Sequence, residues 1–116
     1  MKKIFSALII ALVATSFAFA QEKEPTFEKQ EDLVKATYYH ENGMIKEVGY
    51  FKDEKLHDQW IRYDNTGKIS VVANYDNGIK EGKWYIVGEE TTKEITYKEN
   101  KLIKVEEVQG TDLYFI

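Results

Sequence analysis

The stretch "NYDNGIKEGKWYIVG", residues 74 to 88, contains the features that decide the fold of this chain. Asn77-Gly78 lies between "VVANYD" and "IKEGKW". An Asn-Gly pair between apolar segments favours a two-residue type I′ turn, because both central residues need a positive φ. The stretch therefore predicts a β-hairpin, and its second strand places a small residue, Gly82, two positions before a large one, Trp84.

A less well matched copy of this stretch lies upstream. "YHENGMIKEVGYFKDEKLHDQWIRY" (39 to 63) and "YDNTGKISVVANYDNGIKEGKWYIV" (63 to 87) match position by position, which places Trp60 on Trp84. A third, degraded copy follows after a two-residue deletion, and a period of this length indicates stacked structural units. We expect repeats at about 39–62, 63–86 and 87–108, followed by a C-terminal edge strand at 111–116.

Each repeat contains two turns. Asp53-Glu54 and Glu99-Asn100 are weaker equivalents of Asn77-Gly78. The other turn, "HENG" at 40–43 and "DNTG" at 64–67, fits a type I turn whose final glycine takes the left-handed position of a bulge. Turns that alternate in this way predict an all-β fold, an antiparallel β-meander forming an elongated, twisted single sheet.

Strand pairing about Asn77-Gly78 predicts which side chains share a face. It places Tyr75 opposite Lys80 and Ala73 opposite Gly82, so Gly82 should make room for the ring of Tyr75. The same construction upstream puts Trp60 over Gly49, with Asp58 where the pattern expects glycine. The residues that we expect to form the structural repeat are Gly43, Gly49, Trp60, Gly67, Ala73, Tyr75, Asn77, Gly78, Gly82 and Trp84.

These residues resemble a known repeat. Asn-Gly followed by "EGKWYI", preceded by an aromatic residue and accompanied by "YxxxG" turns, is similar to the bacterial variant of the MORN repeat over about residues 38 to 105. The resemblance implies hairpin units that stack into an elongated antiparallel sheet and act as a scaffold. Such a fold does not fix the function.

Labels attached to similar proteins fit this sequence less well. Bacterial MORN-like proteins are described as antitoxins or as membrane-binding proteins, and some secreted relatives as nucleotidyltransferases. An antitoxin acts in the cytoplasm, whereas this chain carries an export signal. A nucleotidyltransferase needs a phosphate-binding glycine-histidine motif and a basic clamp, neither of which the sequence contains.

The N-terminus predicts export. In "MKKIFSALIIALVATSFAFA", two lysines precede an apolar run that ends in an A-x-A pattern, as in a secretory signal peptide cleaved after Ala20. The chain contains no cysteine, so it is not a lipoprotein. We expect a periplasmic or secreted protein with a flexible charged leader at 21–32 and a β-repeat domain at 33–116.

Charge limits the partners of the exported protein. Residues 1–20 contain two of the 16 basic residues and none of the 20 acidic ones, so the processed chain has 14 basic residues and a net charge of −6. Acidity of this size disfavours nucleic acid and anionic lipid as partners. The lack of cysteine also excludes disulfides and thiolate metal ligands.

No motif of catalysis or metal binding is present. His40 and His57 lack metal-ligand spacing, and Ser70 lacks the glycines of a nucleophile elbow. Adjacent acids such as Glu89-Glu90 and Glu106-Glu107 point to opposite faces of a strand and cannot converge on one substrate. We therefore expect no catalytic, cofactor-binding or metal site.

An aromatic surface is the remaining candidate for function. The expected binding surface consists of Tyr39, Tyr50, Tyr63 and Tyr85, which stand beside turns or on the face opposite Trp84. Such rings anchor protein partners or stack on sugars; alternatively, they form a second small core covered by the leader or by the C-terminal "TDLYFI". The terminal sheet edge also offers unpaired backbone groups.

The sequence as a whole leads to one functional hypothesis and one alternative. The hypothesis is an exported, non-enzymatic module that binds another protein or has a structural role in the cell envelope. The alternative is a module that binds carbohydrate or another small ligand.

Overall fold

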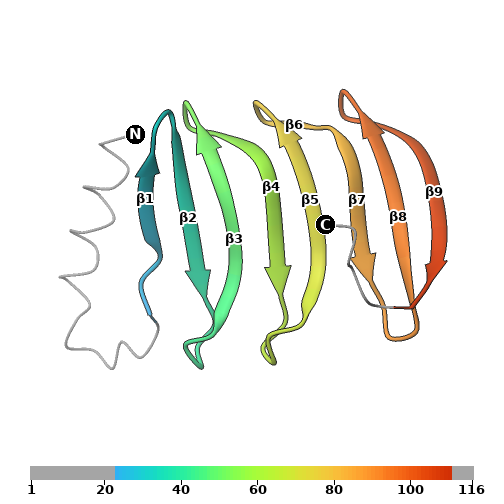
Figure 1. Cartoon of the computed structure of the whole chain (residues 1–116), viewed down its shortest axis with the longest axis horizontal. Helices are drawn as coiled ribbons and strands as arrows, with labels where there is room; N and C mark the ends of the chain where they lie inside the picture. Colours follow the sequence, from blue (N-terminus) through green and yellow to red (C-terminus); the bar gives the residue numbers. More distant parts are fainter. Residues whose placement is uncertain (1–22, 111–116) are drawn as a thin grey trace.

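The computed structural model describes residues 23–110, and these residues form one antiparallel sheet (Figure 1). The strands follow the chain order β1-β2-β3-β4-β5-β7-β8-β9, and the short strand β6 pairs only with β5. Their bounds are β1 Thr26–Gln30, β2 Leu33–Tyr39, β3 Ile45–Lys52, β4 Lys55–Tyr63, β5 Ile69–Asp76, β6 Ile79–Lys80, β7 Gly82–Val87, β8 Thr91–Lys98 and β9 Lys101–Gln109. The all-β meander predicted from the sequence is confirmed. The expected signal peptide and the expected strand at 111–116 lie outside the described residues.

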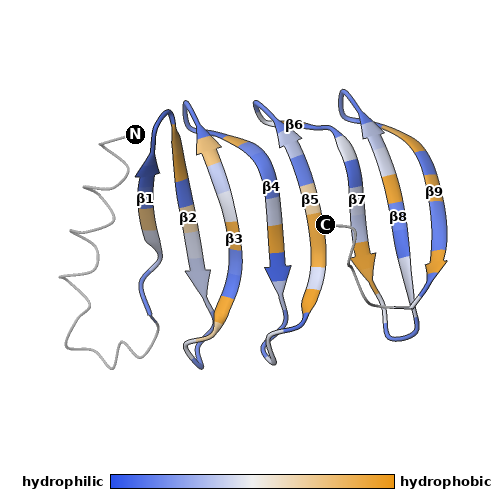
Figure 2. Ribbon diagram, viewed as in Figure 1, coloured by the Kyte–Doolittle hydropathy of each residue, from blue (hydrophilic) through white to orange (hydrophobic). Residues whose placement is uncertain are grey.

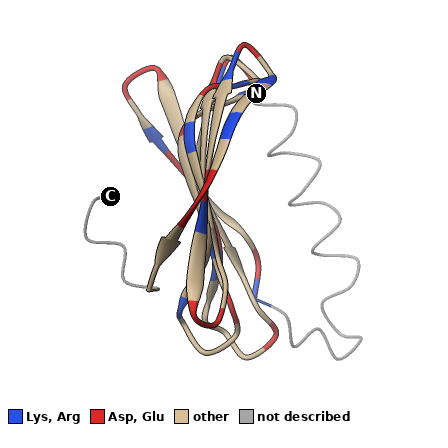
Figure 3. Cartoon of the chain, turned by 90° about the vertical axis from the view of Figure 1, so that its right-hand side faces the viewer, with Lys and Arg blue, Asp and Glu red and all other residues tan. Residues whose placement is uncertain are grey.

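The sheet is open and strongly twisted. When the sheet is viewed from its side, its successive strands cross one another at an angle (Figure 3). The right-handed twist of individual strands produces this crossing. Hydrophilic residues concentrate in the turns, whereas apolar residues are spaced along the strands (Figure 2). Within residues 23–110 no second sheet or helix covers this layer, so the bulky side chains on each face must pack against their neighbours on the same face.

The hairpin turns at one end of the sheet have the geometry that Asn77-Gly78 predicts. Asn77 has a φ of 51° and Gly78 a φ of 87°. The equivalent positions also have positive φ: 49° and 67° for Asp53 and Glu54, and 49° and 70° for Glu99 and Asn100. The three turns therefore share one backbone shape, although only one has the residue pair best suited to it.

The turns at the opposite end also follow the prediction. Gly67 has a φ of 96° and its N–H donates to the carbonyl oxygen of Asp64 at 3.0 Å. The Asp64 carboxylate accepts bonds from the backbone N–H groups of Thr66 and Lys68 at 2.9 and 3.0 Å. These bonds lower the pKa of Asp64, the bond from the Thr66 hydroxyl having the largest effect.

The predicted register holds only next to the turn. Tyr75 faces Lys80 as expected, but farther along Val72 faces Tyr85 and Val71 faces Ile86. Two extra residues of the second strand bulge out at Glu81 and Gly82. Consequently, Gly82 does not make room for the Tyr75 ring.

Gly82 is needed for its backbone conformation. Its φ is +80°, and a Cβ added there would lie 3.9 Å from the nearest atom, Cβ of Asn74. Asp58, one repeat upstream, has a φ of 61° at the equivalent bulge. Asp tolerates the left-handed region better than most residues, which explains why Asp58 replaces glycine there.

The expected flexible leader at 21–32 is wrong at Thr26–Gln30, five of its twelve residues. Thr26–Gln30 forms β1, which pairs with β2. Thr26 faces Thr37 at one end of the pairing, and Gln30 faces Leu33 at the other. The Phe27 ring packs edge-on against Tyr38, with the ring centroids 6.2 Å apart. Because the other side chains of this edge strand are exposed, their charges gave the segment the composition of a linker.

Candidate functional site

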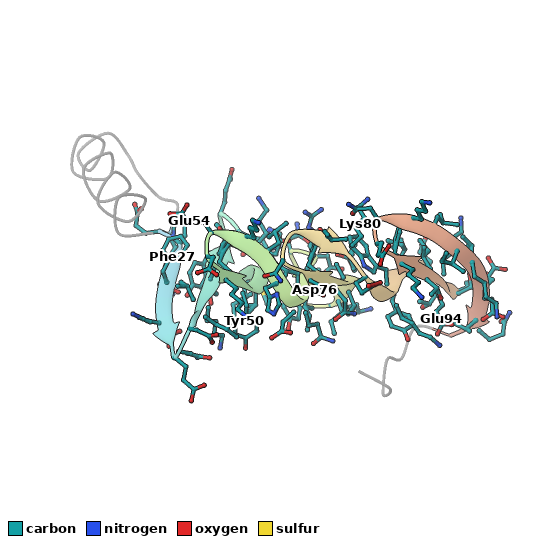
Figure 4. The ribbon with its side chains drawn as sticks, turned by 90° about the horizontal axis from the view of Figure 1, so that it is seen from above. Phe27, Tyr50, Glu54, Asp76, Lys80 and Glu94 are labelled. Atoms are coloured by element: carbon teal, nitrogen blue, oxygen red, sulfur yellow. The ribbon has the colours of Figure 1, made fainter. Side chains whose placement is uncertain are left out.

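The two faces of the sheet differ in their side chains. Looking down the strands, Lys80 points to one side and Tyr50 and Glu94 to the other (Figure 4). We call the side of Lys80 the aromatic face, and its rings are Phe27, Tyr38, Phe51, Trp60, Tyr75, Trp84 and Tyr97. We call the other side the second face.

The two tryptophans of the aromatic face are held by the same hydrogen bond. Trp60 Nε1–H donates to the carbonyl oxygen of Tyr50, and Trp84 Nε1–H to that of Asn74, both at 2.9 Å. The donor and the acceptor of the second bond each lie one repeat after their counterparts in the first. Because the only polar group of each indole is satisfied by the backbone, the rest of each ring is apolar surface.

Trp60 is the floor of this face. Its side chain covers Gly49, as predicted, because a Cβ at residue 49 would overlap the indole. Trp60 is only 6% exposed, and it forms the core with Ala36 and Ala73. Small residues on three neighbouring strands thus let a large ring lie flat against the sheet.

Other rings continue from Trp60 and Trp84 across the sheet. Phe51 meets Trp60 edge-on at 5.1 Å between centroids, and Tyr38 stacks near it at 6.5 Å. In the next repeat Trp84 contacts Tyr75 at 5.2 Å and Tyr97 at 5.1 Å. The aromatic face is therefore continuous from β1 to β8.

A hollow lies over Trp60, between the rings of adjacent repeats. It has a volume of about 320 Å³ and is lined by Tyr38, Lys46, Glu47, Phe51, Leu56, Trp60 and Tyr75. At its rim, Glu47 Oε1 lies 3.8 Å from a guanidinium nitrogen of Arg62. An apolar floor with a charged rim is the typical arrangement of a binding pocket.

The tyrosines of the hollow are hydrogen-bonding groups rather than acids. Burial, and to a lesser extent the Glu47 carboxylate, raises the pKa of Tyr38. Burial also raises the pKa of Tyr75, with a further contribution from Glu47. Both hydroxyls stay protonated at neutral pH and can donate a hydrogen bond to a bound group.

A cation adjoins the hollow on the next repeat. Lys80 Nζ lies 5.4 Å from the ring centroid of Trp84 and 5.1 Å from that of Tyr97. A lysine over two rings is attracted by their negative faces. This contact covers part of the Trp84 surface and orders the aromatic face between β6 and β8.

The surface predicted from Tyr39, Tyr50, Tyr63 and Tyr85 is not an exposed strip. The four residues lie on the second face or beside its turns, as expected, but Tyr85 is only 7% exposed. Burial, followed by the charge and a hydrogen bond of Glu94, raises its pKa. Glu94 is also bound by Lys83 Nζ at 3.4 Å.

The other three tyrosines are partly buried. The Tyr39 hydroxyl lies 3.3 Å from Thr26 Oγ1, and Lys23 Nζ lies 4.2 Å above its ring centroid. The row of facing residues on this side contains Thr37, Val48, Ile61, Val72 and Tyr85, of which Thr37, Val72 and Tyr85 are buried. The second face thus has the character of the second small core that was the alternative interpretation.

The histidines connect turns of neighbouring repeats. His57 Nδ1 accepts a hydrogen bond from the Asn77 N–H at 3.1 Å, and Glu81 accepts one from the Glu99 N–H at 3.2 Å in the next repeat. His40 Nε2 lies 2.9 Å from the carbonyl oxygen of Tyr63.

Within residues 23–110, no group of three or more His, Asp or Glu side chains could hold a metal ion.

The hollow includes residues that sequence reasoning missed. Glu47 and Arg62 face each other across β3 and β4 only because of the bulge at Asp58. Tyr38 was overlooked beside Tyr39, although the alternation of a strand assigns the two to opposite faces. The sequence signal for the bulge was Asp58 itself, standing where the repeat expects glycine.

The comparisons with known proteins give no family. No protein-family model, curated protein or solved structure matches this chain. In the part of the chain that the structure describes, no helix is long and apolar enough to cross a membrane.

Proposed function

We propose that this protein is an exported, non-enzymatic β-repeat module that binds another protein through its aromatic face. The observation that carries the proposal is the hollow over Trp60, which combines an apolar floor with the charged pair Glu47–Arg62 at its rim. An apolar side chain of a partner fits such a floor, and the rim groups bind polar atoms beside it.

Partner binding also agrees with the chemistry of the hollow. Its two tyrosine hydroxyls are protonated donors, and its one lining carboxylate, Glu47, is paired with Arg62 and lies beside a second cation, Lys46. Tyrosine hydroxyls that stay protonated are poor nucleophiles and poor general bases near neutral pH. A recognition role needs only the rings, hydroxyls and charges that are present.

Carbohydrate binding is the weaker alternative. Sugar rings stack on aromatic side chains whose flat faces are open, but Trp60 is 6% exposed and Lys80 lies over Trp84 and Tyr97. The hollow is also lined by the apolar side chains of Phe51 and Leu56 and by the charged residues Lys46 and Glu47. This shape fits a side chain better than a stacked pyranose.

The experiment is site-specific photocrosslinking in the native cell. A crosslinking side chain at Lys46, on the rim of the hollow, should capture one protein of the envelope or secreted fraction. The matched control carries the same group at Lys35, whose backbone pairs with Tyr50 and which belongs to the second face. Capture from position 46 alone supports the proposal, whereas equal capture from both positions, or none, contradicts it.

A further inference from the structure

The sheet has two open edges, and they differ in length and polarity. Within residues 23–110, no strand pairs with the outer edge of β1 or of β9. β1 has five residues, with Phe27 its only large apolar side chain. β9 has nine residues, and Leu102, Ile103 and Val105 are 56%, 59% and 50% exposed. A long, apolar and exposed edge strand is prone to pair with another strand.

The charges of β9 complement those of a second, antiparallel copy. The pairing of β9 with β8 shifts at Ile103, between the pairs Thr96 with Lys104 and Tyr97 with Leu102, so side chains of β9 alternate regularly only from Lys104 onward. If two β9 strands pair over this regular part about a two-fold axis perpendicular to the sheet, facing residues must point to the same side, so their numbers sum to an even value. A sum of 210 places Val105 opposite Val105 and Lys104 opposite Glu106, twice. The neighbouring registers place Lys104 opposite Lys104, or Glu106 opposite Glu106, and like charges directly opposite are destabilising.

The electrostatics within one chain favour the same arrangement. Glu106 faces Glu94 on β8, which is a like-charge pair, and its nearest cation is Lys104 at 3.2 Å. In the register centred on Val105, each Glu106 gains a second lysine from the other copy. The four side chains form an alternating cluster across the two-fold axis.

We propose that the protein forms a two-fold symmetric dimer by antiparallel pairing of β9 with β9 of a second copy, centred on Val105. The two sheets become one continuous sheet, and the two-fold axis keeps both aromatic faces on the same side. Val105 of each copy covers the other, next to Ile95 on β8. This inference is independent of the partner-binding function, but it would present two hollows to one partner.

The register is tested by disulfide formation, because the chain contains no cysteine. Directly facing residues of an antiparallel pair have Cα atoms about 4.5–5.5 Å apart, which a disulfide spans. Val105→Cys, in the protein purified in the form that the cell produces, should crosslink to a dimer on mild oxidation. The control Glu107→Cys should not, because its symmetry mate lies four residues away along the strands, about 13 Å.

Charge exchange tests the ion pairs separately. Lys104→Glu should weaken self-association at least about tenfold in analytical ultracentrifugation, and Lys104→Glu/Glu106→Lys should restore it. Failure of the double variant to restore the dimer, or equal crosslinking at residues 105 and 107, overturns the proposed register.

A different occupant of the edge is recognised by truncation. If residues 111–116 cover β9 within one chain, the whole protein is a monomer at all concentrations, and a chain ending at Gly110 becomes a dimer. That result overturns the proposal. A whole protein that dimerises with or without these six residues supports it.

Discussion

The indole of Trp60 lies so close to Gly49 that a Cβ at residue 49 would overlap ring atoms Cδ2, Cε2 and Cε3. The contact joins β3 to β4 under the hollow, and its geometry is fixed by the hydrogen bond from Trp60 Nε1 to the Tyr50 carbonyl. A glycine is therefore required on the strand that faces the tryptophan.

Gly49→Ala should destabilise the protein by about 1–3 kcal/mol, because the added methyl group overpacks the site. Urea denaturation followed by tryptophan fluorescence measures the cost. In a Trp60→Leu background the same substitution should cost clearly less. Equal costs in the two backgrounds would mean that the indole is not what excludes a side chain at residue 49.

Gly82→Val should destabilise the protein by about 1–2 kcal/mol, because a branched residue is forced into a positive φ. The structure locates this cost in the backbone rather than in contact with Tyr75. Thermal unfolding of Gly82→Val and of Gly82→Val/Tyr75→Ala should thus show no rescue by the second substitution. Recovery of stability in the double variant would mean that residue 82 contacts Tyr75, as the register predicted from the sequence requires.

Asp58→Gly is the complementary change. Since Asp58 already has a φ of 61°, glycine relieves conformational strain there. The free energy of unfolding should change by less than about 1 kcal/mol in either direction, because relief of strain offsets the greater freedom of glycine in the unfolded chain. A loss above about 2 kcal/mol in chemical denaturation would give the Asp58 carboxylate a role that its exposure does not suggest.

Stability should fall in alkali. The pKa values of Tyr38, Tyr75 and Tyr85 are all raised by burial from an ordinary value of 10.0. Tyrosines of the unfolded chain therefore lose their protons first, so stability is fully present below pH 10.0 and is lost as the pH rises through the folded-state pKa values. Urea midpoints across this range give the slope, and Tyr85→Phe should make it shallower. An unchanged slope in that variant would contradict burial of Tyr85.

The turn contacts can be tested one at a time. His57→Ala removes the acceptor of the Asn77 N–H and should cost about 0.5–1.5 kcal/mol, the usual net contribution of one hydrogen bond. Amide hydrogen exchange should accelerate at Asn77 but not at Glu99, whose acceptor is Glu81. Equal acceleration at both amides would indicate general loosening instead of a lost contact.

Sequence reasoning predicted what depends on local signals. Asn77-Gly78 and the glycines at 43 and 67 need particular φ values, so they identified both sets of turns and hence the meander. The packing of Trp60 on Gly49 was also anticipated, because each of the first two repeats sets a large residue beside a small one.

What failed depends on relations between strands. The bulges at Asp58 and Gly82 shift the pairing beyond them by two residues. No local rule distinguishes a glycine that makes room for a neighbouring ring from one that is needed for its positive φ. The hollow was missed for the same reason, since Glu47 meets Arg62 only in the shifted register. Burial of Tyr85 depends on its neighbours across the sheet rather than on its own strand.

The most direct measurement is the affinity of the protein captured from position 46 for three forms of this chain: wild type, Arg62→Glu and Lys35→Glu. Both variants replace a basic residue by an acidic one, but only Arg62 contacts a rim residue of the hollow. The account predicts at least about a tenfold loss of affinity for Arg62→Glu, with Lys35→Glu close to wild type. Unchanged binding by Arg62→Glu, or an equal loss in both, would contradict a binding site on the aromatic face.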